Sequence, residues 1–368
     1  MPIHDVGYRS WDGPKTRPWF RWMVITKTGV RLAMKSTWVR RILFAAWLPL
    51  MYWSVGFFMM EKSLKKDADM FSETIGQQLD MLPPVEPVSQ AVNDVERMMS
   101  EGNSIKGQLA AETMLRNGIF KYFPHSEQLA DAYKSQDVHR IRKEVWRWLM
   151  MAFFRYPQSV AIMFLIGMIA PSLIAQDIRS RAFLMYFSRP IGKLEYIFGK
   201  LMVLTVFIGC IVTLPALAMY VFAVFMSPDF TVLYSTWDIP IRILVASVVV
   251  ITPTALLALA LSSLTQESRF ANFSWFAVWA LGHGTYLAVM FATAIGMKTN
   301  ALAPEITNNS IVESCSHLSL YNCLGKVQEM VFGFSSWDEA WKSAVVLTIL
   351  SLVSMYFLYQ RVSQSTQQ

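Results

Sequence analysis

Few residues in this chain of 368 carry side chains that could do chemistry directly. Cys315 and Cys323 lie eight positions apart and could pair as a disulfide on an oxidising side of a membrane, although spacing alone does not establish the geometry. His317 lies between them, but two thiols and one imidazole lack the fourth ligand of a structural zinc site. We therefore leave the disulfide open and assign no metal site.

His283 lies near the middle of a long uncharged run and is flanked by Gly282 and Gly284. An ionisable side chain at membrane depth indicates a transport pathway, a proton relay or a hydrogen bond between helices. The other interpretation is a neutral imidazole held by a neighbouring helix, with the glycines allowing close packing. We favour packing and keep the pathway as the alternative.

Motifs for catalysis are missing from the sequence. A phosphate-binding loop needs Gly-x-x-x-x-Gly-Lys-Ser/Thr, and Gly199-Lys200 has neither the earlier glycine nor the following hydroxyl. No Ser-His-Asp, Cys-His or paired-carboxylate arrangement recurs beside an apolar run. We predict that the chain is not an enzyme and that any work driven by ATP requires a partner.

The composition is that of an integral membrane protein, with 54% hydrophobic, 14% aromatic and only 16% charged residues. The net charge of +7 could indicate nucleic-acid binding. However, the Lys and Arg residues gather beside the hydrophobic runs, where they orient a protein in the bilayer. We therefore predict contact with lipid and no nucleic-acid partner.

Uncharged runs long enough to cross a bilayer predict an all-α membrane protein with six transmembrane helices. The first run, of 19 residues, spans roughly 28 Å as a helix. Pro49 within it should kink the helix without abolishing it. The six predicted spans are 42–60, 156–176, 201–228, 243–266, 270–297 and 343–360.

The segment 1–41 holds nine Lys or Arg against two Asp. Lys27, Arg31 and Lys35 repeat every four residues, and Trp22 and Ile25 lie on another side of the same predicted helix. This pattern is typical of an amphipathic helix in the membrane interface, and we predict a cytoplasmic amphipathic segment before the first span at 42–60.

Between the first two spans, residues 61–148 have frequent and nearly balanced charges. We predict a helical insert that leans on the rest of the protein because it is short for an independent domain. Within it, Asp137 can cap a helix that begins at Val138 and stops before Pro157.

The short basic flanks of the spans decide orientation, because long segments cross largely regardless of charge. They favour a cell-membrane, multi-pass protein with both termini in the cytoplasm, and they place the insert 61–148 and the loop 298–342 outside. Spans two to six then occupy 149–368. The basic residues near the ends of the insert argue against this orientation, but its length weakens that argument.

The loop 177–200 between spans two and three carries five basic and two acidic residues, so this orientation makes it cytoplasmic. It also contains an unbroken apolar run, 182–187, which a solvated loop has no physical reason to expose. Pro190 disfavours helical geometry at Arg189, so two short helices hinged at 188–190 are expected.

This loop resembles that of permeases of the ABC-2 type exporter family. The resemblance is carried by Asp177, the run 182–187, Ser188-Arg189-Pro190-Ile191, Tyr196 and Gly199-Lys200, together with the six-span layout. In that family the loop forms a coupling helix that docks on a separate nucleotide-binding ATPase subunit. By resemblance, the coupling residues are Asp177, Arg179, Arg181, Phe183, Tyr186, Ser188, Arg189 and Pro190.

The resemblance implies that the chain is the permease subunit of an ATP-binding cassette exporter, with ATP and magnesium held by the partner subunit and no cofactor in this chain. It also implies a second permease copy or homologue, because the family builds its pathway from two membrane halves. A different class of function remains open: a membrane scaffold or signal-transmitting protein that acts through the insert 61–148 without moving a substrate.

Overall fold

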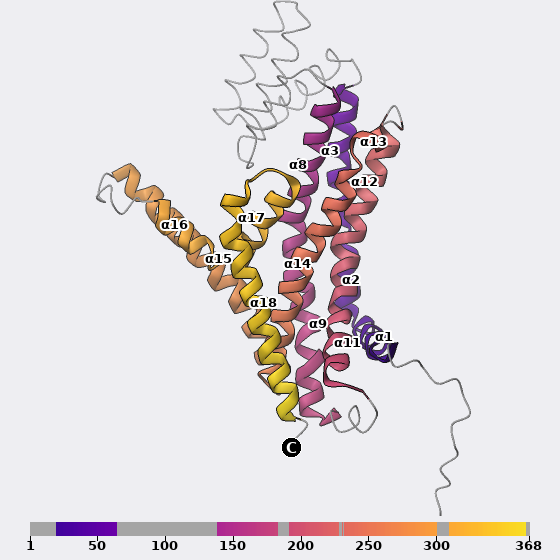
Figure 1. Ribbon diagram of the computed structural model, residues 1–368, viewed down its shortest axis with the longest axis vertical. Helices are drawn as coiled ribbons and strands as arrows, with labels where there is room; N and C mark the ends of the chain where they lie inside the picture. Colours follow the sequence, from indigo (N-terminus) through magenta and orange to yellow (C-terminus); the bar gives the residue numbers. More distant parts are fainter. Residues whose placement is uncertain are drawn as a thin grey trace, which may run out of the picture.

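The computed structural model describes residues 20–64, 138–182, 191–227, 230, 232–299 and 309–365. Every regular element in these residues is a helix, as expected for an all-α protein (Figure 1). The first half contains α1 (Arg21–Met34), α2 (Thr37–Ala45), α3 (Leu48–Leu64), α8 (Val138–Phe153), the π-helix η3 (Phe154–Gln158) and α9 (Ser159–Arg179). The second half contains α11 (Lys193–Ile208), the π-helix η4 (Gly209–Thr213), α12 (Leu214–Met226), α13 (Val232–Ser235), α14 (Asp238–Ser263), α15 (Ser268–Thr299), α16 (Asn309–Ser316), α17 (Leu320–Phe332) and α18 (Trp337–Ser365).

Six helical stretches among the described residues are long and apolar enough to cross a membrane, which confirms the predicted number of spans. They are Thr37–Phe58, Arg140–Arg179, Lys193–Met226, Asp238–Ser263, Ser268–Ala292 and Trp337–Gln364.

The predicted helix end before Pro157 is wrong. The chain runs as one helix from α8 through η3 into α9, with Pro157 inside the π-helical turn. A π-helical turn relaxes the usual i−4 pairing, so the missing N–H and the ring of a proline are accommodated without a break. The hydroxyl of Ser159 donates to the carbonyl of Phe154 at 3.2 Å within the same turn. Residues 138–148, predicted as part of the insert 61–148, thus belong to the helix that continues into span two; residues 65–137 lie outside the described residues.

Span one is divided between two helices. α2 ends at Ala45 and α3 begins at Leu48, so Pro49 falls in the first turn of a new helix, where its missing N–H costs no helical hydrogen bond. The indole of Trp47 at the break donates to the carbonyl of Cys210 in η4 at 3.1 Å.

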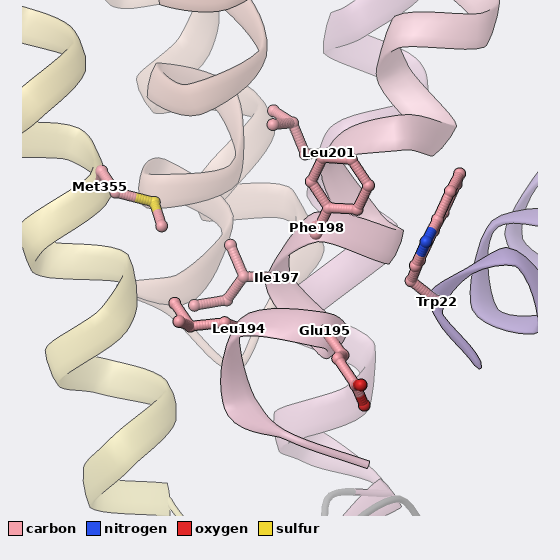
Figure 2. Close-up of a pocket in the computed structure, with 7 residues that line it drawn as sticks. All are labelled: Trp22, Leu194, Glu195, Ile197, Phe198, Leu201 and Met355. Atoms are coloured by element: carbon pink, nitrogen blue, oxygen red, sulfur yellow. The ribbon is translucent and has the colours of Figure 1, made fainter. Parts of the chain in front are cut away.

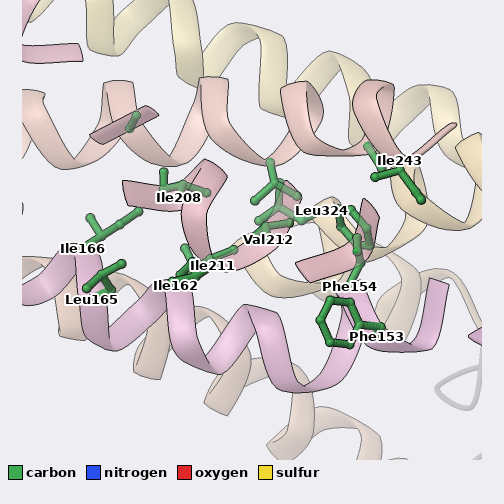
Figure 3. Packing of buried hydrophobic residues seen from close by; sticks show 14 of the residues in the cluster. Phe153, Phe154, Ile162, Leu165, Ile166, Ile208, Ile211, Val212, Ile243 and Leu324 are labelled. Carbon is green, nitrogen blue, oxygen red and sulfur yellow. The ribbon is translucent and has the colours of Figure 1, made fainter. Parts of the chain in front are cut away.

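The core lies where α9 and α14 cross α11 and η4 (Figure 3). In an apolar stretch of 18 residues from each span, 67% of residues are buried in spans two and four and 44% in span three, against 17%, 11% and 22% in spans one, five and six. The inner spans therefore form the packed centre, and the outer three leave apolar faces for lipid or another chain. The labelled core residues are Phe153, Phe154, Ile162, Leu165, Ile166, Ile208, Ile211, Val212, Ile243 and Leu324.

One end of the bundle holds four segments that are far apart in sequence. The end of α9, the start of α11, α1 and the end of α18 lie together there (Figure 1). The ammonium of Lys193 donates to the hydroxyl of Ser363 at 2.9 Å, and Arg361 donates to the carbonyl of Ser263 at 3.3 Å. We call this the loop end, defined by Arg179 at the end of α9 and Lys193 at the start of α11.

Candidate functional site

The two ends of the loop 177–200 are joined by a buried ion pair. The ammonium of Lys200 on α11 lies 2.7 Å from a carboxylate oxygen of Asp177 on α9, and it also donates to the carbonyl of Leu173 at 2.6 Å. The phenol of Tyr196, one turn before Lys200, donates to the same carboxylate oxygen at 2.7 Å. We name Asp177, Tyr196 and Lys200 the clamp.

Burial makes the clamp rigid. Lys200 is only 6% exposed and Tyr196 is fully buried, so neither side chain can exchange its partners for water. A buried charge that loses its partner is far more costly than an exposed one, because the remaining ion stays in a medium that solvates it poorly. α9 and α11 are therefore tied together where the loop leaves and re-enters the bundle.

The remaining predicted coupling residues fall into two groups. Arg179 is exposed and pairs with Glu267, in the turn between α14 and α15, at 3.4 Å. Arg181 follows the end of α9 with φ of 53°, a left-handed conformation that terminates the helix. The others, Phe183, Tyr186, Ser188, Arg189 and Pro190, lie outside the described residues.

The chain re-enters the bundle at a capped helix start. The carboxylate of Glu195 accepts a hydrogen bond from the backbone N–H of Gly192 at 2.9 Å, which fixes the first turn of α11. The capping turn lies directly before Tyr196. The turn that starts α11 is therefore adjacent in the chain to a residue of the clamp.

α1 packs directly on the clamp helix. A Cβ at Gly199 would lie 2.9 Å from Cβ of Ile25, and one at Gly29 would lie 2.6 Å from a methyl of Val203, so only glycine fits at both contacts. The hydroxyl of Thr26 lies 3.0 Å from the carbonyl of Gly199. The predicted helix in segment 1–41 is thus present and packs its small-residue face on α11; its place in the membrane interface stays a prediction.

A pocket of about 540 Å³ opens beside this contact (Figure 2). Its walls are apolar apart from Glu195, and the rings of Trp22 and Phe198 meet edge to face with centroids 4.9 Å apart. The lining residues are Trp22, Leu194, Glu195, Ile197, Phe198, Leu201 and Met355. The pocket joins α1, α11 and α18, so a change in the position of α1 or α11 also changes its shape.

His283 on α15 packs against aromatic rings, chiefly the ring of Tyr321 on α17, with centroids 4.8 Å apart. Its Nδ1 is buried and has no hydrogen-bond partner among the described residues, so the hydrogen bond expected from packing is not formed there. Gly282 allows a close approach, since a Cβ there would lie 2.8 Å from the carbonyl oxygen of Leu318. Gly284 has open space around it and serves no such contact.

Sequence reasoning missed a charged pair that fixes α17. Arg155, in the π-helix η3, lies 3.7 Å from the carboxylate of Glu329 and 4.9 Å from the centre of the Tyr321 ring. Gly325 leaves room for the guanidinium, because any Cβ there would overlap it. The signal in the sequence was a lone arginine at the edge of an apolar run, together with a glycine in an otherwise bulky helix.

A second missed cluster surrounds Asp238 at the start of α14. Its carboxylate pairs with Arg147 at 2.6 Å, Arg242 at 3.0 Å and Lys143 at 3.2 Å. Arg242 also donates to the carbonyl of Val331 near the end of α17. One acid thus connects α8 to α14, and Arg242 extends the connection to α17.

The structure contains no disulfide between Cys315 and Cys323, since both are free thiols. The thiol of Cys323 instead donates to the carbonyl of His317 at 3.2 Å, and burial raises its pKa to about 11. The imidazole of His317 turns toward Ser343 on α18 at 3.2 Å, and burial, with the charge of Lys326, lowers the pKa of this histidine. No group of three metal-binding side chains occurs among the described residues.

These features define a class of protein: a helical bundle with six candidate membrane spans, in which a buried acid, tyrosine and lysine join the two ends of the loop 177–200. The particular family follows from comparison with known proteins. Residues 30–363 match the model of the ABC-2 family transporter proteins, so the chain belongs to that family. No curated protein and no solved structure matched the chain.

Several of the residues that carried the resemblance meet in the structure. The acid, the aromatic residue and the Gly-Lys pair, separated by up to 23 positions, converge in the clamp and its contact with α1. The chain is a multi-pass membrane component of an ABC transporter, a class that works with a nucleotide-binding ATPase subunit.

Proposed function

We propose that this chain is the permease subunit of an ABC exporter and that the loop 177–200 receives the movement of the ATPase subunit. The observation that carries this proposal is the clamp, in which Asp177 joins Lys200 at 2.7 Å in a buried setting. Separating a buried ion pair is costly, so the clamp should keep α9 and α11 together when the loop is displaced.

The proposed movement reaches four helices: α9, α11, α1 and α17. Displacement of the loop acts on α9 and α11 together, because the clamp joins them. It continues into α1 through the contacts at Gly199 and Gly29. The two helices approach closely there because glycine has no side chain to separate them. In the π-helical turn η3 of span two, Arg155 connects the same long helix to α17 through Glu329. Closure of the ATPase pair would thus shift α1, spans two and three, and α17 together.

A second permease copy completes the proposal. Spans one, five and six bury few residues within the chain, so their apolar faces are available to a partner as well as to lipid. The pathway would lie between two copies, with the loop ends of both facing the cytoplasm.

Co-purification from native membranes tests the coupling. The intact protein should retain a nucleotide-binding ATPase subunit, and replacing Arg189 and Pro190 together with alanine should release it. His283→Ala is the matched control, because it lies on α15 away from the loop, and it should leave the complex intact. Absence of any ATPase subunit from the intact protein would sink the coupling hypothesis and favour the scaffold alternative.

A further inference from the structure

The segment that contains α1 and α2 is strongly basic. From Arg21 to Ala45 the chain contains six Lys or Arg residues and no Asp or Glu. α1 is fixed across the loop end by its packing on Gly199, and α2 begins the first span at Thr37. The positive charge is therefore held at the point where the chain enters the membrane, which is the depth of lipid headgroups.

Two of these basic residues line a pocket on one face of α2. The pocket is a shallow, open depression of about 480 Å³, lined by Thr37, Arg40, Arg41 and Phe44. These positions are spaced as i, i+3, i+4 and i+7, so they form a single helical stripe. The stripe is polar at its first turn and aromatic one turn further into the span.

The guanidinium groups in this pocket are available to a ligand. Both arginines are exposed, and within the part of the chain that the structure describes neither takes part in an ion pair. Arg41 lies over the ring of Trp38, 5.2 Å from its centre, which orients the guanidinium without neutralising it. Two adjacent unpaired cations in one pocket are complementary to an anion with several oxygen acceptors.

The apolar side of the pocket distinguishes a lipid from a soluble anion. Phe44 is 74% exposed, and the residues that follow along the same span, including Leu48 and Met51, are also exposed. An acyl chain attached to a bound phosphate would run along this surface, whereas a free phosphate would leave it uncovered. Because the first span starts inside the pocket, such a ligand would arrive from the bilayer itself.

We propose that the pocket of Thr37, Arg40, Arg41 and Phe44 binds an anionic phospholipid in the leaflet at the loop end. The two arginines bind the phosphate oxygens, the hydroxyl of Thr37 donates a further hydrogen bond, and Phe44 packs against the first part of the acyl chain. Because α2 is joined to α1, a bound lipid also steadies α1 on the clamp helix. The proposal does not depend on transport activity.

Native mass spectrometry of the purified full chain tests the site. The probes are phosphatidylglycerol and phosphatidylcholine with the same acyl chains, titrated into delipidated protein. The wild type should retain phosphatidylglycerol preferentially. An Arg40→Gln, Arg41→Gln double variant should weaken that binding by about 100-fold, since each lost hydrogen bond between a guanidinium and the charged phosphate contributes about tenfold.

The matched control is a Lys27→Gln, Arg31→Gln double variant, which removes the same charge from exposed positions on α1 outside the pocket. It should bind phosphatidylglycerol within about threefold of wild type, because neither side chain lines the pocket and charges outside it act on a bound phosphate only through solvent that salt screens. If both double variants lose the same affinity for phosphatidylglycerol, the lipid binds by general attraction to positive charge, and the proposed site is wrong.

Two further outcomes also count against the proposal. Inorganic phosphate that displaces phosphatidylglycerol at millimolar concentration would assign the pocket to a soluble anion. Loss of the ATPase subunit from the Arg40→Gln, Arg41→Gln variant in lipid-free detergent would assign it to a protein contact. Thermal unfolding of each variant without lipid checks folding, and unchanged midpoints keep the comparison valid.

Discussion

Replacing Lys200 with methionine removes the cation of the clamp while keeping much of the side chain's volume. Asp177 then loses its ion pair and keeps the hydrogen bond from Tyr196. The carboxylate side chain is 15% exposed and the lysine side chain 7%, so solvent compensates little. Breaking a buried pair by removing one partner costs about 3–5 kcal/mol of the free energy of unfolding.

A double-mutant cycle separates this pair from its surroundings. Asp177→Asn removes the other charge and strands the ammonium of Lys200, which retains the carbonyl of Leu173. Removing both charges leaves no ion behind, so the double variant should be less destabilised than the sum of the single variants, by up to about 3 kcal/mol. Unfolding by denaturant in mixed micelles, followed by tryptophan fluorescence, measures all four proteins.

Arg179→Gln is the matched control for the cycle. It breaks the ion pair with Glu267 at the same end of the bundle, but the arginine side chain is 67% exposed. Such a pair contributes about 0–1 kcal/mol. If Lys200→Met costs no more than Arg179→Gln, or if the two clamp substitutions are additive, the clamp is not a buried pair and the proposed transmission path fails.

Three further predictions concern the other end of the bundle and the segment around α17. Gly325→Ala should destabilise the protein, because the new methyl group would occupy the space of the Arg155 guanidinium. Its thermal midpoint should lie well below that of Gly284→Ala, where a Cβ meets open space. Equal midpoints would contradict the packing. His317 has a lowered pKa in the folded protein, so the unfolded chain binds more protons below about pH 6.5. Stability should therefore fall as the pH drops through that range, and a His317→Asn variant should show a flatter profile; a wild-type profile that does not change would refute the shift. Cys315 should react with a maleimide at neutral pH while Cys323 stays unmodified, because Cys323 is buried and burial raises the pKa of its thiol to about 11. Rapid labelling of both thiols would contradict this and show that α17 exposes Cys323 to solvent.

The local patterns of the sequence predicted some elements well. Apolar runs predicted six spans, because burial in lipid demands a long uncharged helix wherever the chain crosses. The expected helix end at Pro157 was wrong. Proline usually breaks an α-helix because it lacks an N–H donor, but Pro157 lies in a π-helical turn, which a single sequence does not reveal. The disulfide expected as one outcome at Cys315 and Cys323 is not present, because the fold turns the second thiol inward.

The sequence by itself determined the class of this protein, since hydrophobicity and helical length depend only on the order of residues. It also placed Asp177, Tyr196 and Gly199-Lys200 in one pattern that resembled a family loop. Only the tertiary structure decided that these residues meet in a buried clamp against α1, and that Arg155 meets Glu329 across 174 positions. The physical reason is that contacts between distant helices depend on how their surfaces fit, and a single sequence does not state that fit.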